Sequence, residues 1–134
     1  MTTSNSKALN VALWVAQALL FLAFAGAGFI KVTTPVEELA TKMAWAAELP
    51  NLVRFIGVSE LLGAVGVILP ALTRIKPVLT PTAAAALVVV MVLALGYHIS
   101  HGETAMVGGP LVLGALATFV AWGRFLKAPI APRG

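Results

Sequence analysis

Long apolar stretches separated by short polar segments organise the whole chain. Four of them are long enough, or nearly so, to cross a hydrocarbon core, which takes about 20 helical residues. These stretches cover residues 9–30, 52–72, 81–100 and 105–124. The pattern predicts an all-α fold in which residues 1–134 form one integral membrane domain, an antiparallel bundle of four helices.

The segment between the first two spans carries a helical pattern of its own. Thr34, Pro35 and Glu37 have the form of a capping box with proline at the first helical position. We expect a short amphipathic helix over residues 35–48, lying at the outer membrane surface with Trp45 as an interfacial anchor. Such a helix either covers the bundle or serves as a lid over a ligand.

Composition supports lipid as the natural solvent of this chain. Of its 134 residues 60% are apolar and 10% are charged, whereas a typical soluble domain has about 25% charged residues. The formal net charge of +4 is dispersed, and no basic run is interleaved with aromatic residues, which argues against a nucleic-acid partner. The absence of cysteine excludes disulfides and thiolate metal sites within these residues.

The charges of the connecting segments predict an orientation. Basic residues gather on the cytoplasmic side of membrane proteins. One side of the predicted topology holds six basic residues and no acid, and the other holds three basic residues mixed with acidic ones. The six are Lys7, Arg74, Lys76, Arg124, Lys127 and Arg133. We therefore expect a multi-pass protein with both termini in the cytoplasm.

One carboxylate, Glu60, stands well inside the second span. The apolar residues of this span contribute roughly −3 to −5 kcal/mol to insertion, against a penalty of about +2.5 to +3.5 kcal/mol for a central acid. At 1.5 Å per residue, Glu60 lies about 12 Å below the outer end of its helix. Gly57, Gly63 and Ala64 share its face, and small residues mark where membrane helices approach each other. Glu60 is therefore expected to point into the bundle as a buried carboxylate.

Other polar groups of the spans fall at the same predicted end. They are Lys31, Arg54, Tyr97, His98 and His101. Antiparallel connections convert these scattered positions into one outer polar cluster, although Arg54 points about 120° away from Glu60 on its helix. In a simpler interpretation Lys31, Arg54 and His101 only extend toward lipid headgroups, and Glu60 only forms a buried pair.

A carboxylate among apolar walls can exchange a proton with a lipophilic molecule or accept a hydrogen bond from its polar head. Glu60 and His98 are the candidate acid/base residues, with Lys31 as the charge partner of Glu60. The remaining predicted ligand-binding residues are Arg54, Gly57, Tyr97 and His101. A two-histidine, one-carboxylate metal site is a weaker alternative, and we predict no metal.

Two motifs resemble a known family. A G-x-x-K segment at residues 28–31 is followed by Pro35, and the second span reads R-x-x-G-x-x-E-L-L-G from Arg54 to Gly63. Both are similar to the DoxX-like membrane proteins, and the resemblance covers nearly the whole chain. It implies a small four-helix bacterial protein of the cytoplasmic membrane, with Lys31, Gly57 and Glu60 among the motif positions.

The resemblance also suggests chemistry, because the family name comes from an association with quinol oxidation and thiosulfate metabolism. The lack of cysteine weakens a direct sulfur role, and quinone becomes the candidate cofactor by analogy alone. The leading hypothesis is an outer-leaflet polar pocket centred on Glu60 for a quinone-like or isoprenoid-like molecule, with a redox link.

Two other functions stay open, and whether the chain is an enzyme is left undecided. The first is a non-catalytic accessory subunit of a membrane redox complex, in which Glu60 only locks the helices together. The second is an acid/base isomerase or epoxide-opening enzyme acting on a membrane-dissolved substrate. The expected partners are the lipid bilayer, a lipophilic small molecule, and a membrane redox protein or a second copy of the chain.

Overall fold

The computed structural model describes residues 3–133, and over this range the chain is helical with no strand. Its elements are α1 (Thr3–Thr33), α2 (Val36–Lys42), α3 (Trp45–Glu48), α4 (Pro50–Thr73), α5 (Leu79–Ser100), the 3₁₀-helix η1 (Thr104–Met106), α6 (Gly108–Trp122) and the π-helix η2 (Gly123–Lys127). The all-α fold class predicted from the sequence is therefore confirmed.

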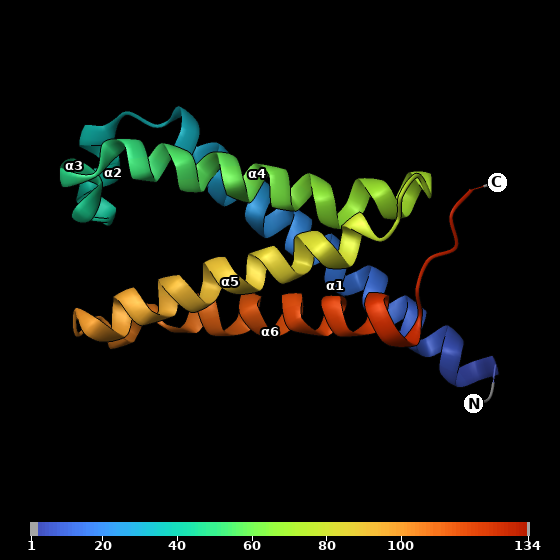
Figure 1. Ribbon diagram of the computed structural model, residues 1–134. Coiled ribbons are helices and arrows are strands. Elements are labelled where there is room, and N and C mark those ends of the chain that lie inside the picture. The colour runs from blue at the N-terminus through green and yellow to red at the C-terminus, as the bar shows by residue number, and fades with distance from the viewer. Residues whose placement is uncertain (1–2, 134) are drawn as a thin grey trace.

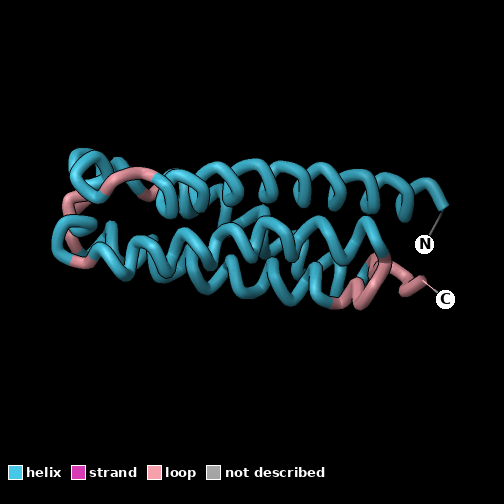
Figure 2. The backbone as a smooth tube through the Cα atoms, turned by 90° about the horizontal axis from the view of Figure 1, so that it is seen from above, coloured by secondary structure: helices cyan, strands magenta, loops and turns pink. Residues whose placement is uncertain are grey.

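The four long helices run alongside one another and alternate in direction (Figure 1). Helix α1 packs mainly against α4, and α5 packs against both α4 and α6. The two termini lie at one end together with the α4–α5 connection, while α2 and α3 lie at the other end (Figures 1 and 2). We call these the termini end and the α2–α3 end.

Each long helix is apolar enough to cross a membrane. The candidate spans are Lys7–Thr33, Pro50–Thr73, Leu79–Ser100 and Thr104–Lys127. Many of their largest apolar side chains face outward, among them Leu22 (66% exposed), Phe55 (68%) and Leu93 (68%). Helices satisfy their own backbone hydrogen bonds, so such an apolar exterior suits a hydrocarbon solvent. The fold is that of a multi-pass helical membrane protein.

The centre of the bundle is a continuous apolar core to which all four helices contribute. Leu20 and Phe24 of α1, Val67 of α4, Leu87 of α5 and Val120 of α6 are all at most 1% exposed. This core separates the charged side chains at one end of the bundle from those at the other.

The single surface helix expected over residues 35–48 is divided into α2 and α3. The division lies at Met43, whose backbone is extended (φ −138°, ψ 96°). The expected capping box is wrong: the residue at the start of α2 is Pro35, and no side chain caps this end. Buried apolar side chains hold the segment down instead, namely Leu39, Ala46 and Val53. The segment therefore covers the bundle at the start of α4.

Candidate functional site

Helices α1 and α4 approach each other very closely where two glycines meet. A Cβ atom added to Gly28 would lie 2.7 Å from the carbonyl oxygen of Gly57, and one added to Gly57 would lie 2.8 Å from Cβ of Lys31. Neither position has room for a methyl group, because a backbone atom or a Cβ atom already fills the space. The two glycines thus set the distance between the helices and bring the backbone of Lys31 beside α4.

Lys31 and Glu60 form an ion pair across this crossing. The Nζ atom of Lys31 lies 2.8 Å from Oε1 of Glu60. Side chains of a helix lean toward its N-terminus, so Lys31 extends from its position beside Gly57 toward Glu60, which lies about one turn further along α4. The Glu60 side chain is 4% exposed and that of Lys31 is 17% exposed. Glu60 therefore points into the bundle, as its small-residue face predicts.

Arg54 joins the same region from a different direction. Its NH1 group donates hydrogen bonds to the carbonyl oxygens of Lys31 and Thr34, each at 2.7 Å. The last carbonyls of a helix have no partner within the helix and carry the negative end of its dipole. A guanidinium at this position gives the carbonyls a hydrogen-bond donor and places a positive charge at the negative end of the dipole. Arg54 therefore fastens the end of α1 to the start of α4.

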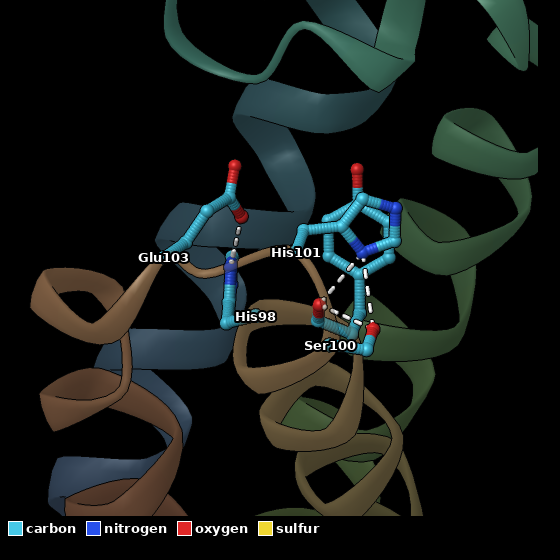
Figure 3. A network of polar contacts seen from close by, with 5 residues as sticks. His98, Ser100, His101 and Glu103 are labelled. Carbon is cyan, nitrogen blue, oxygen red and sulfur yellow. Dashed lines mark hydrogen bonds and ion pairs between the residues drawn. The ribbon is translucent and has the colours of Figure 1, made fainter.

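The polar residues that end α5 have partners close to them in the chain (Figure 3). Nδ1 of His98 lies 2.7 Å from Oε1 of Glu103. Nδ1 of His101 lies 2.9 Å from the carbonyl oxygen of Tyr97 and 3.1 Å from Oγ of Ser100. Both histidines are thus held by α5 and the residues that directly follow it. The acid/base role expected for His98 beside Glu60 stays a prediction.

Tyr97 connects this group to the segment that covers the bundle. Its ring stacks on that of His101 with centroids 4.0 Å apart, and lies 6.0 Å from the ring of Trp45 in α3. The α2–α3 end therefore has two polar groups, one between α1 and α4 and one on α5. Within residues 3–133, no side-chain hydrogen bond joins the first group to the second.

Two cavities of the bundle lie away from Glu60. One, of about 510 Å³, is at the termini end, where α5, η2 and the C-terminal segment meet. The other, of about 170 Å³, lies between α5 and α6. Neither is lined by Lys31 or Glu60. In the part of the chain that the structure describes, no three His, Asp or Glu side chains gather as metal ligands would.

Residues 15–120 match the DoxX-like family. The chain belongs to the DoxX-like family. The match includes both motifs, and with them the Lys31–Glu60 pair, the two glycines of the crossing and Arg54. No curated protein and no solved structure matches the chain. Family membership agrees with the observed architecture of a multi-pass membrane protein.

Sequence reasoning missed a second buried polar group in this DoxX-like protein. Arg124, in η2, is 3% exposed. Its Nε donates to Oε1 of Gln17 and its NH1 to Oδ1 of Asn10, both at 2.8 Å. Gln17 is fully buried, and its Nε2 donates to the carbonyl oxygen of Val67 at 2.8 Å. The sequence does place one glutamine, Gln17, inside an apolar span, which could have indicated a buried polar group. Nothing in the sequence distinguishes Arg124 from the other basic residues near the termini.

The Lys31–Glu60 pair of the DoxX-like protein is chemically versatile. Its carboxylate accepts hydrogen bonds and its ammonium group donates them, and a proton moved between Nζ and Oε1 would neutralise both groups at once. The low dielectric of apolar surroundings strengthens each of these interactions. The pair is therefore equipped for hydrogen bonding or proton exchange with a polar group that reaches it.

Proposed function

We propose that this DoxX-like protein binds the polar head of a lipophilic small molecule at the Lys31–Glu60 pair. The observation that carries the proposal is a carboxylate 4% exposed, held by a single lysine, inside a helix able to span a membrane. Ionisable groups in such spans are costly and usually belong to binding or proton-transfer sites. The presence of a buried carboxylate in the apolar helix α4 therefore favours a site over a scaffold.

The pair suits a ligand head that carries oxygen atoms. A hydroxyl group would donate to Glu60, and a carbonyl oxygen would accept from Lys31. A quinone-like head offers carbonyls when oxidised and hydroxyls when reduced, so the same two residues could bind both forms. The apolar remainder of a quinone-like or isoprenoid-like molecule would lie along the apolar exterior of α1 and α4.

Access to the pair would come through the lysine rather than through separation of the helices. Gly28 and Gly57 close the contact between α1 and α4 with no space for an added methyl group. Lys31 is the more exposed partner, at 17% against 4% for Glu60, and its side chain is long and flexible. A ligand arriving from the surrounding lipid would displace the ammonium group and take its place beside the carboxylate.

A second function, that of a non-catalytic accessory subunit, is favoured by a separate observation. The glycines and Arg54 all tighten the α1–α4 contact, and Arg54 does so through two hydrogen bonds of 2.7 Å. On this alternative Glu60 only locks the two helices, and the apolar exterior docks against a larger membrane redox complex.

Native mass spectrometry of protein extracted gently from its own membrane separates the two functions. With a ligand site, wild-type protein carries a lipophilic molecule that Glu60→Gln lacks, while circular dichroism shows both chains folded. Glu103→Gln is the matched control, since it removes the same chemical group at the same end and should keep the molecule. If no bound molecule distinguishes Glu60→Gln from wild type, and loss of thermal stability is the only effect of the change, the structural alternative is correct.

A further inference from the structure

We propose that the termini end holds a binding site for the anionic headgroup of a membrane phospholipid, with Arg124 and Lys76 as its cationic residues. This site is independent of the Lys31–Glu60 pair, which lies toward the opposite end of the bundle. Two of the residues that build it, Asn10 and Arg124, lie outside the segment that matches the family.

The first observation is a buried cation with no anion beside it among residues 3–133. The hydrogen bonds of Arg124 go to uncharged oxygens only, those of Asn10, Gln17 and the backbone of Ala128. Its NH2 nitrogen is buried and has no hydrogen-bond partner among the described residues. A guanidinium taken out of water without a counter-charge is strongly unfavourable, so an anion supplied from outside would complete the arrangement.

No acidic side chain of the chain lies at this end of the bundle. Its five acidic residues are Glu37, Glu38, Glu48, Glu60 and Glu103. They belong to α2, α3, the first half of α4 and the segment after α5, and thus to the half of the bundle at the α2–α3 end. The charged side chains at the termini end are all basic, and include Lys76 in the α4–α5 connection and Lys127 in η2. We therefore assign the missing counter-charge to another molecule.

The second observation is a cavity of about 510 Å³ that Arg124 lines together with Lys76. Most of its remaining wall is apolar, and includes Leu79, Phe125 and Ile130. A headgroup phosphate could interact with the two cations while the glycerol and upper acyl carbons cover the apolar wall. Inorganic phosphate has no apolar part, so this wall favours an amphiphile over a free anion.

The backbone around the cavity also suits an occupant that enters from the membrane side. Arg124 belongs to a π-helix, a local widening that is frequent at functional sites. Beyond it the C-terminal segment runs back to the α4–α5 connection (Figure 1), where the amide of Arg133 donates to the carbonyl oxygen of Arg74 at 2.8 Å. Phe125 and Leu79 stay 44% and 47% exposed at the edge of this enclosure. The cavity is thus bounded by protein on one side and open to lipid on the other.

A lipid titration followed by native mass spectrometry tests the proposal. Delipidated full-length protein in a neutral detergent is titrated with dioleoyl phosphatidylglycerol or with dioleoyl phosphatidylcholine, which differ only in their headgroups. We expect one phosphatidylglycerol to bind about tenfold more tightly than phosphatidylcholine, the difference that one charge-assisted contact supplies. Lys76→Gln, at an exposed position, should weaken phosphatidylglycerol binding roughly fivefold, and Arg124→Gln should weaken it further.

Lys127→Gln is the matched control, because it removes one positive charge from η2 without touching the cavity. Equal binding of the two lipids would overturn the proposal, and so would equal losses in Lys76→Gln and Lys127→Gln. Displacement of the lipid by millimolar inorganic phosphate would overturn a lipid occupant in favour of a soluble anion. If Arg124→Gln does not fold, the comparison of Lys76→Gln with Lys127→Gln decides alone. Glu60→Gln should leave phosphatidylglycerol binding unchanged, which separates this test from that of the ligand site.

Discussion

The ammonium nitrogen of Lys31 lies 2.8 Å from Oε1 of Glu60, although 29 residues separate the two in the chain. The pair lies in the apolar contact between α1 and α4 and is almost closed to solvent. Its two charges cancel only while both groups remain. The stability of this contact therefore depends on the pair as a unit, which leads to an experiment on both residues together.

Removing only one member of the pair should destabilise the fold more than removing both charges. Lys31→Met leaves a buried carboxylate unpaired, which costs about 3–5 kcal/mol when the partner of a buried pair is lost. Lys31→Met with Glu60→Gln has no such charge and should recover a large part of that loss. Thermal unfolding in detergent, followed by circular dichroism, measures the difference.

The matched control for this cycle is the pair of His98 and Glu103, whose acid is 42% exposed. An exposed pair contributes about 0–1 kcal/mol, so Glu103→Gln should change the unfolding temperature little. Strictly additive effects of the Lys31 and Glu60 changes would contradict the coupling we infer.

The close contact of Gly28 and Gly57 predicts a strong dependence on residue size. Gly28→Ala and Gly57→Ala would each drive a methyl group to within 3 Å of atoms on the facing helix. Because these atoms include a backbone oxygen at Gly28 and the Cβ of Lys31 at Gly57, the helices must separate, and overpacking of this kind costs about 1–3 kcal/mol. Both variants should unfold at lower temperature than wild type.

Gly26→Ala is the control on the same helix, because a Cβ atom there meets nothing within 4 Å. Alanine favours helix formation over glycine by about 1 kcal/mol in water, so this variant should be neutral or slightly stabilised. Equal losses at Gly26 and Gly28 would contradict the proposed role of the α1–α4 contact, because a Cβ atom at Gly26 meets no atom of the facing helix.

Arg54 is predicted to hold the end of α1 through its two backbone hydrogen bonds. Arg54→Gln should lose both, and hydrogen exchange should then accelerate at the amides that end α1 and connect it to α2. A hydrogen bond to a charged group contributes about 1.5–3 kcal/mol, so the local protection should fall by at least tenfold. Lys42→Gln removes a nearby exposed charge and should leave exchange unchanged. Acceleration spread evenly over α5 and α6 would instead indicate general destabilisation.

The inward direction of Glu60 could be predicted because helical periodicity places it on the same face as Gly57 and Gly63. The hydrogen-bond partners of Arg54 could not be predicted in this way. Arg54 binds backbone carbonyl oxygens, and every residue has one whatever its side chain. His98 meets Glu103 because the chain reverses at Gly102, where φ is +69°. Helical periodicity does not predict this turn, and the local contact with Glu103 competes with the longer-range pairing with Glu60 that periodicity suggests for His98.

Arg124 shows a different limit of sequence reasoning. A basic residue near the end of a span normally extends toward the lipid headgroups, so the sequence places Arg124 among the terminal charges. The Arg124 side chain points inward at the place where α6 ends and the π-helix η2 begins. Its Nε donates a hydrogen bond to Gln17, which lies 107 residues earlier in the chain. No single segment contains this information, because the two partners meet only when α1 and η2 pack together.

The last prediction concerns this Gln17–Arg124 contact. Gln17→Leu removes the acceptor of the buried Arg124 Nε and leaves it without a partner, while the carbonyl oxygen of Val67 keeps only the hydrogen bond of its own helix. Each unsatisfied buried group costs about 1–3 kcal/mol, and more when it is charged. The variant should unfold at a clearly lower temperature in lipid-free detergent, despite its greater hydrophobicity.

Thr118→Val makes a similar polar-to-apolar change in α6, where the hydroxyl is exposed and bonds only to Gly114 of its own helix, and should be neutral. If Gln17→Leu proved as stable as Thr118→Val, the buried hydrogen bonds of Arg124 would contribute little, and its enclosure would result from packing against Trp14, whose ring lies 5.5 Å from the guanidinium carbon.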